Sequence, residues 1–526
     1  MTKESIPHLR EAIQSLESKM ASLLSEREML ESRLEQAVRL QSPIHRLPNE
    51  LLASIFVNGV FDTEEEDPLM LSNVMLVCRH WSAVAVDTPM LWSKIVVSNH
   101  HSTDRAKIKL ARSKSVPLDI SIDFNPRLEH GGQVTQNIVY AMDILRPSIY
   151  RWRSFSMLLP NRAQAHAALM RCRDPAPLLE VFSVRVFHSM QEDHHASAPP
   201  PLFSEFTPRL QSCSFTSFNF GWDLRLVSGL RVLKLGGYWN GFSPSVTAVL
   251  DMLRACPQLE ELALRNMSDV DSEPVSSTND LSLTTTDDFF LPNTDSRTVH
   301  LPKLIKASFY YSGILRTQTV LGQLVFPALQ NLELCYLDNV TPVLKYLAKQ
   351  SLTSLPLRRL RIESSFFNEL KLAMFLRRLP SLTTLELIDA EDVSANLLKG
   401  LSTPSSGQTW ICPKLDTLDL SGCTALDWDA LRTFIESRLP PHSRAANVTL
   451  PPSTFVASAS AQAMYQHPRG VARGGGSGMV EPKRVKSVDL TRCHQISKEM
   501  VQWLKVYIPE VKCEVPKGEG SWGVDR

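Results

Sequence analysis

One pattern recurs in three stretches of this chain: PALQNLEL at residues 327–334, PSLTTLEL at 380–387 and PKLDTLDL at 413–420. In each stretch a proline is followed by leucines that are three and then two residues apart. Alternating apolar and polar residues are typical of a short strand with one buried face. The pattern therefore predicts strands that recur along the chain.

Further copies extend this array in both directions. PQLEELAL at 257–264 and PKLIKASF at 302–309 are clear, an alternating strand is expected at 117–122, and looser copies begin at Trp152, Leu179, Leu210, Leu230, Leu357 and Val485. Most spacings lie between 20 and 33 residues, near the period of leucine-rich repeats. Stretches of helical spacing intervene at 245–256, 368–379 and 429–439.

This alternation predicts an α/β fold over residues 98–512. It is an irregular leucine-rich-repeat solenoid, with a parallel sheet on the concave face and helices outside. A β-sandwich is the competing all-strand interpretation, and the intervening helices disfavour it. Polar stretches at 268–298 and 440–482 are expected to be loops outside the array, and 513–526 a tail.

Two cysteines end repeat strands, in LDLSGC at 418–423 and VDLTRC at 488–493. These stretches resemble the cysteine-containing class of leucine-rich repeats. We expect the thiols of Cys423 and Cys493 to satisfy buried backbone groups rather than to react or to bind metal.

The repeat spacing also identifies side chains that face outward from the concave strands. A mixed-sign polar surface fits a protein target better than a phosphate backbone. The alternative is that these residues are merely solvated. The predicted target-binding residues are Lys306, Tyr310, Glu333, Arg359, Arg361, Glu363, Glu386, Asp419 and Asp489.

Residues 1–42 carry a different pattern. Apolar residues recur at alternating steps of four and three, at Leu9, Ile13, Leu16, Met20, Leu23, Leu30, Leu34 and Ala37, and Arg27 interrupts the series. This is the seam of a coiled-coil helix, which predicts a homodimer through residues 9–37. The alternative is an amphipathic helix folded back on its own chain.

Residues 43–97 predict a small helical domain. In LPNELLASIF at 47–56, Pro48 suits a first helical turn, and the apolar residues from Leu51 to Phe56 form one helical stripe. A second helix is expected to carry Val74 and Trp81 on one face, and Leu91 and Trp92 close the segment. So short a segment cannot bury all these side chains, so part of its surface should contact another protein.

Three blocks of this segment, LPNELLASIF at 47–56, VCRHW at 77–81 and Leu91-Trp92, resemble the F-box in order and in sequence. With the N-terminal coiled coil, the chain resembles a fungal type of F-box or F-box-like protein with C-terminal leucine-rich repeats. The resemblance implies docking on the adaptor subunit of an SCF-type cullin–RING ubiquitin ligase, and through it on the cullin. An acidic insert at 62–67 lengthens the usual spacing. The residues implied in docking, some of them shared with the domain's core, are Leu47, Pro48, Glu50, Leu51, Ile55, Phe56, Val77, Cys78, Trp81, Leu91 and Trp92.

Composition excludes several other classes of protein. The chain has 526 residues and a net charge of +1, which gives no general reason to expect a nucleic acid or an anionic membrane as partner. No long apolar run or signal peptide is present, and the nine cysteines are dispersed, which fits a cytoplasmic or nuclear protein. We found no catalytic motif and predict no enzyme activity, cofactor or metal site.

The predicted function is therefore that of a substrate-recognition adaptor. The F-box-like segment would bind the ligase, and the repeats would bind a protein target. The alternative is a ubiquitin-independent repeat scaffold, in which the F-box-like helices only cap the solenoid.

Overall fold

The computed structural model describes residues 6–41, 44, 47–61, 68–99, 101–124, 131–187, 201–238, 243–267, 298–350, 355–402, 409–439 and 482–513. The acidic insert 62–67, nearly all of the two predicted loops and residues 514–526 of the tail lie outside the described residues. The chain divides into two compact units, unit 1 at Met1–Ile120 and unit 2 at Ser121–Arg526.

Unit 1 is mainly helical. Its elements are α1 (Ile6–Gln41), α2 (Asn49–Phe61), α3 (Pro68–Val77), α4 (Arg79–Asp87), the 3-10 helix η2 (Pro89–Trp92), β1 (Lys94–Ser98) and α5 (Thr103–Arg112). The single helix predicted through Val74 and Trp81 is wrong, because the chain breaks at Cys78. That residue is extended, with φ −162°, and its Sγ accepts a hydrogen bond from the Trp81 N–H at 3.5 Å. Cys78 therefore caps α4 instead of continuing α3.

Unit 2 is built on parallel strands, and the prediction of an α/β repeat solenoid is confirmed. Within unit 2 the described strands from β3 to β16 follow chain order in one sheet, which omits only β8 and β10, and these two pair with each other. Every predicted repeat copy contains a strand, and the strand pairs from β3 onward are parallel, which excludes a sandwich of antiparallel sheets. The strands are β2 (Leu118–Asp123), β3 (Trp152–Leu159), β4 (Val181–Val186), β5 (Ser212–Thr216), β6 (Val232–Tyr238), β7 (Glu261–Met267), β8 (Val299–His300), β9 (Lys306–Tyr310), β10 (Leu324–Val325), β11 (Asn331–Cys335), β12 (Arg359–Glu363), β13 (Thr384–Ile388), β14 (Thr417–Asp419), β15 (Ser487–Asp489) and β16 (Glu510–Lys512).

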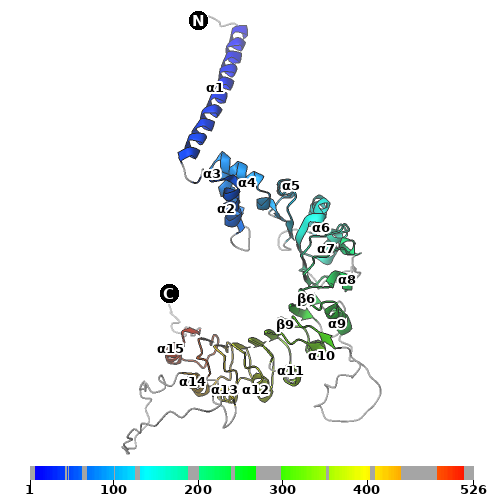
Figure 1. Ribbon diagram of the computed structural model, residues 1–526, viewed down its shortest axis with the longest axis vertical. Coiled ribbons are helices and arrows are strands. Elements are labelled where there is room, and N and C mark those ends of the chain that lie inside the picture. The colour runs from blue at the N-terminus through cyan, green and yellow to red at the C-terminus, as the bar shows by residue number, and fades with distance from the viewer. Residues whose placement is uncertain are drawn as a thin grey trace, which may run out of the picture. The chain divides into compact units, whose positions relative to one another are not determined.

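Helices connect most of these strands. Figure 1 shows α9 to α15 following one another along one side of unit 2. The three helical stretches predicted from sequence are α9, α12 and α14. The helices of unit 2 are α6 (Gly131–Leu145), α7 (Arg162–Leu169), α8 (Leu224–Val227), α9 (Val246–Arg254), α10 (Ile314–Gly322), α11 (Thr341–Gln350), α12 (Glu369–Leu376), α13 (Ala395–Ser402), α14 (Trp428–Ser437) and α15 (Lys498–Tyr507), with the 3-10 helices η3 (Arg146–Arg151) and η4 (Leu202–Glu205).

The repeat leucines stack into one core. The register aligns Leu332 with Leu360, Leu385 and Leu418 on successive strands, and each is at most 1% exposed. Burying a leucine side chain stabilises a fold by roughly 1.5–3 kcal/mol. Because neighbouring repeats supply each other's core, the strands are stable only as an array.

The repeat cysteines occupy this core as predicted. The Cys423 thiol donates to the Leu387 carbonyl at 3.2 Å, and the Cys493 thiol donates to the Leu420 carbonyl at 3.1 Å. Burial raises the pKa of Cys423 to about 12, so the thiol stays protonated and unreactive at neutral pH. Beside it, Gly422 has φ +73°, and a Cβ atom there would lie 1.8 Å from a carboxylate oxygen of Asp389. Only glycine fits this turn.

Candidate functional site

The F-box segment has a hydrophobic core of its own. Phe56 of α2 lies against Trp81 of α4, with ring centroids 4.9 Å apart. The Trp92 indole N–H donates to the Ala85 carbonyl at 2.9 Å. The buried members of this core are Leu52, Phe56, Val60, Leu71, Val74, Val84, Ala85, Leu91 and Trp92. These helices therefore form a packed domain from their own residues.

Three residues assigned to docking belong to that core. Phe56 is 1% exposed, which corrects its assignment to the docking surface, and Leu91 and Trp92, at 0% and 5%, fall on the core side of the expected division between core and docking. The apolar residues of α2 cover more of the helix surface than the domain core can bury, so some of them face the core and others face solvent. Leu52 and Phe56 point into the domain, and Leu51 and Ile55, each one position earlier, point out.

The other predicted docking residues are accessible to different degrees. Leu51 is 53% exposed and Ile55 is 50% exposed, one helical turn apart on α2. Pro48, Glu50 and Val77 are exposed, and Leu47, Cys78 and Trp81 are half-buried. We call Leu51 and Ile55, with Pro48 and Glu50 before them, the α2 surface. The α2 surface therefore presents large, exposed aliphatic side chains on a domain that is already folded.

Sequence reasoning missed Leu76, which is 83% exposed near the end of α3. The available signal was its position in the helix, because Leu76 does not share the spacing of the buried residues Leu71 and Val74. Leu76 and Val77 add a second exposed apolar pair to the domain.

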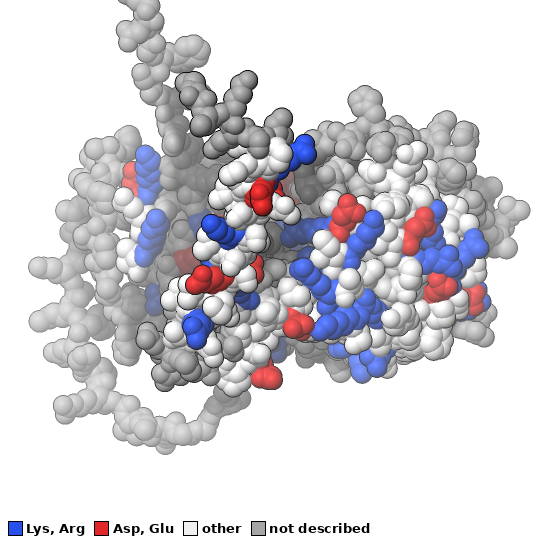
Figure 2. Space-filling view, turned by 90° about the horizontal axis from the view of Figure 1, so that it is seen from above, with Lys and Arg blue, Asp and Glu red and all other residues white. Residues whose placement is uncertain are grey.

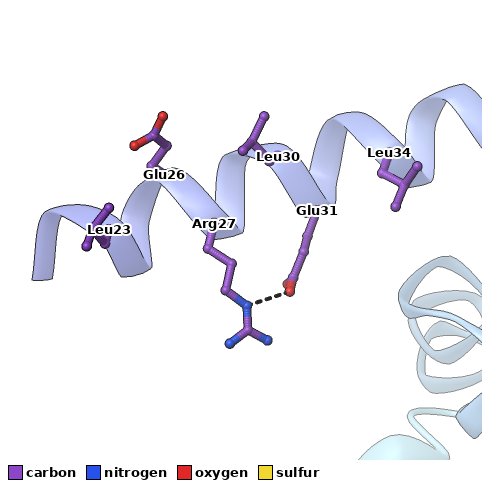
Figure 3. A pocket seen from close by; sticks show the side chains of 6 residues that line it. All are labelled: Leu23, Glu26, Arg27, Leu30, Glu31 and Leu34. Atoms are coloured by element: carbon purple, nitrogen blue, oxygen red, sulfur yellow. Dashed lines mark hydrogen bonds and ion pairs between the residues drawn. The ribbon is translucent and has the colours of Figure 1, made fainter. Parts of the chain in front are cut away.

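Helix α1 exposes its whole apolar seam. From Leu9 to Leu34 the described apolar seam residues are between 44% and 65% exposed. Figure 3 shows Leu23, Leu30 and Leu34 along the helix, with Arg27 turned toward Glu31. The Arg27 Nε donates to the Glu31 carboxylate at 2.8 Å, and this hydrogen bond lowers the pKa of Glu31. The seam cation is therefore paired within its own helix.

On the repeat sheet, the register brings predicted target-binding residues together. Glu333, Arg361, Glu386, Asp419 and Asp489 form one row across five adjacent strands. We call this the charged row. All five are partly buried, as are Lys306, Tyr310 and Arg359.

Both arginines of this region are paired within the sheet. The Arg359 guanidinium donates two hydrogen bonds to the Glu386 carboxylate, each of 2.9 Å. Arg361 donates to Glu386 at 3.4 Å and from Nε to Glu363 at 3.0 Å. The Glu386 side chain is only 12% exposed, so it holds both cations in fixed positions.

The prediction that Glu363 contacts a target is wrong. It is buried, and its carboxylate accepts hydrogen bonds from Arg361 and from the Tyr336 hydroxyl at 3.0 Å. The hydrogen bond from Tyr336 raises the pKa of that phenol to about 12. Glu363 therefore positions neighbouring side chains and leaves little of its own surface for a partner.

Two tyrosines were missed by sequence reasoning. Tyr311 and Tyr336 stack with ring centroids 4.4 Å apart, Tyr310 lies 4.9 Å from Tyr336, and Tyr311 is 44% exposed. Tyr311 and Tyr336 directly follow their strands with φ of 47° and 53°, where the chain turns away. Aromatic side chains of this kind are enriched at protein interfaces.

The C-terminal end of the charged row is acidic. Burial raises the pKa of Asp419, and the neighbouring carboxylates of Asp489 and Glu386 raise it further. The Asp419 carboxylate accepts the Ser421 backbone N–H at 2.9 Å. This end would attract a basic group on a partner.

The described residues give little indication of a nucleic-acid surface, a metal site or a membrane-spanning helix. Figure 2 shows Lys and Arg side chains next to Asp and Glu side chains on the face it presents. No group of three or more His, Cys, Asp or Glu residues there could hold a metal ion. No helix in this part of the chain is both long and apolar enough to cross a membrane.

Comparison with known proteins bears on the N-terminal domain. One chain in a crystal structure of the Rad7 and Elc1 complex in yeast is similar over 97% of this chain and 98% of its own, at 12% sequence identity and a TM-score of 0.39, which does not establish a common fold. None of the curated proteins matches the chain. Residues 44–98 match the F-box-like family, and they are therefore an F-box-like domain, as the sequence blocks predicted.

Proposed function

We propose that this chain is a substrate-recognition adaptor of an SCF-type cullin–RING ubiquitin ligase. In this proposal the F-box-like domain binds the ligase adaptor subunit, and the repeat sheet binds a protein target. The observation that carries the proposal is the exposure of Leu51 and Ile55 on a domain that matches the F-box-like family and has its own core.

The physical argument for docking is the unburied apolar surface. Each large aliphatic side chain transferred from water to an interface contributes roughly 1.5–3 kcal/mol. A domain that fills its core and still exposes Leu51, Ile55 and Leu76 has apolar surface available for a partner. The alternative, a ubiquitin-independent scaffold in which these helices only cap the solenoid, would bury this surface against repeats.

Target binding is assigned to the face that carries the charged row and the tyrosines. Tyr311 supplies exposed aromatic area, and Arg359, Arg361 and Asp419 supply charges whose positions the sheet fixes. An interface of this composition is specific for shape and charge. The chain then needs no catalytic group, because it acts by holding the target at high effective concentration beside the ligase.

We also propose that α1 pairs with a second copy of itself. Its seam is exposed from Leu9 to Leu34, and Arg27 is paired with Glu31, which also accepts a hydrogen bond from Arg79, so the penalty of placing a cation in the seam is partly reduced. Sedimentation of the full chain and of a chain lacking residues 1–42 tests this. A dimer that dissociates on truncation is expected, and a full chain that sediments as a monomer would exclude the pairing.

The adaptor proposal is tested by direct binding. We expect the full chain to bind a purified SCF adaptor subunit, and Leu51→Asp with Ile55→Asp to weaken binding about 100-fold or more, because two buried contacts become unpaired charges. A matched control is Leu370→Asp with Met374→Asp on α12, an exposed apolar pair with the same spacing. Circular dichroism verifies that both variants are folded.

Two results would overturn the proposal. One is a wild-type chain that does not bind the adaptor subunit, and the other is equal binding by the α2-surface variant and the control variant. Either result would favour the scaffold hypothesis.

A further inference from the structure

A pocket opens on the outward face of unit 2, across strands β4 to β9. Its volume is about 320 Å³, and its lining includes Arg185, Lys234, Glu261, Arg265 and Lys306. Ligand pockets in proteins begin at about 300 Å³. None of these residues except Lys306 was expected to bind anything.

Small side chains open the middle of this pocket. The register places Arg185, Thr216, Gly236 and Arg265 in one row on four adjacent strands. A Cβ atom at Gly236 would lie 3.0 Å from the Arg265 carbonyl oxygen, a tight contact, and because residue 236 is glycine it adds no side chain to the floor of the pocket. At about 4.8 Å per strand, the two arginines start about 14 Å apart, so their long side chains can reach a ligand between them.

The lining carries a strong excess of positive charge. Lys234 and Lys306 both approach the Glu261 carboxylate, at 3.2 Å and 3.5 Å, and share that single acid. Arg185 and Arg265 are exposed and have no ion pair with any other described residue. Four cations facing one carboxylate leave three positive charges in excess.

We propose that this pocket binds a phosphate monoester. Arg185 and Arg265 donate hydrogen bonds to the phosphate oxygens from opposite sides of the pocket. Lys234 and Lys306 neutralise the charge of the phosphate from a third side. The hydroxyls of Ser214 and Thr216, which also line the pocket, supply neutral donors. Arginine is suited to this task because its planar group donates two hydrogen bonds at once.

The charges favour phosphate over other anions. A phosphate monoester carries about −1.5 to −2 at neutral pH, which matches the excess better than a single carboxylate does. An extended nucleic acid would have to cross the neighbouring acids Glu333, Glu386 and Asp419 on the same sheet. A compact phosphate avoids that repulsion.

Two sources could supply such a group, a phosphorylated side chain of a protein target or a free phosphate compound. The first deepens the proposed target-binding role and rests on it, and the second does not. Calorimetric titration of the full chain compares a phosphoserine tripeptide, its serine and glutamate counterparts, inorganic phosphate and a single-stranded oligonucleotide.

We expect the phosphoserine peptide to bind more tightly than its counterparts, and Arg185→Gln with Arg265→Gln to weaken it at least tenfold, with the loss increasing at low salt. The matched control is Arg377→Gln with Arg378→Gln, two exposed residues directly after α12, which removes the same charge elsewhere. Inorganic phosphate binding as tightly as the peptide would identify a free phosphate compound as the ligand.

The inference is overturned by equal binding of the pocket and control variants, by the absence of phosphate binding, or by tighter binding of the oligonucleotide. Adaptor docking by α2 is measured separately, so loss of phosphate binding with docking intact would remove this inference alone.

Discussion

The F-box-like domain and the repeat sheet expose different chemistry to solvent. The domain leaves aliphatic side chains such as Leu51 and Ile55 half-exposed to water. The sheet exposes charged side chains, and these are bonded to each other, as Arg359 and Arg361 are to Glu386. The first surface gains free energy from any partner that covers it. The charged surface gains free energy only from a partner whose charges are complementary to its own.

This difference assigns separate roles to the two surfaces. Apolar docking is insensitive to salt, which suits a constant partner such as a ligase subunit. A paired charged surface is desolvated only by a complementary target, which gives specificity rather than general affinity.

The largest expected effect is in the core beneath the apolar surface. Phe56→Ala should lower the free energy of unfolding of the F-box-like domain by about 3–5 kcal/mol, because a buried ring against Trp81 is replaced by a cavity. Leu51→Ala, on the exposed side of the same helix, should change it by less than about 0.5 kcal/mol. Denaturant unfolding followed by tryptophan fluorescence measures both variants. Similar losses in the two would show that α2 does not divide into a core face and an outer face.

A smaller effect is expected on the sheet. Glu386→Ala removes the acceptor that Arg359 and Arg361 share, and should destabilise unit 2 by about 1–2 kcal/mol. The loss is below that of a fully buried pair because both arginines are about a third exposed to solvent. Glu391→Ala, an exposed acid between β13 and α13, is the control. Equal denaturation midpoints for the two variants would mean that the arginines are held by other contacts.

The smallest effect is a pH dependence at Asp419. Its pKa is raised by burial, so the folded state favours the protonated acid, and the contribution of this group to stability is lost as pH rises through the folded-state pKa. Asp419→Asn resembles the protonated acid and can still accept the Ser421 N–H. The variant should therefore melt slightly higher than the wild type at neutral pH, and the difference should disappear in acid. Thermal melts across pH measure this, and a variant that melts lower at neutral pH would contradict it.

The repeat array and the F-box-like blocks could be predicted from the local pattern of residues. Leucines at fixed steps specify a strand, and a repeated strand can bury its leucines only against the next copy, so stacking follows from the local pattern. The helices α9, α12 and α14 follow from their own spacing in the same way. The predicted coiled-coil pairing and the adaptor contact stay predictions, because they concern a second molecule.

The division of the small domain's apolar residues into core and surface could not be predicted in this way, because it depends on how its helices pack. Leu51 and Leu52 are equal by composition, and the packing of α3 and α4 against one side of α2 separates them. Likewise, the pairing of Arg359 with Glu386 and the cationic pocket join residues on different strands, 27 positions apart in the first case. Such contacts depend on register and side-chain direction, which exist only after the repeats have stacked.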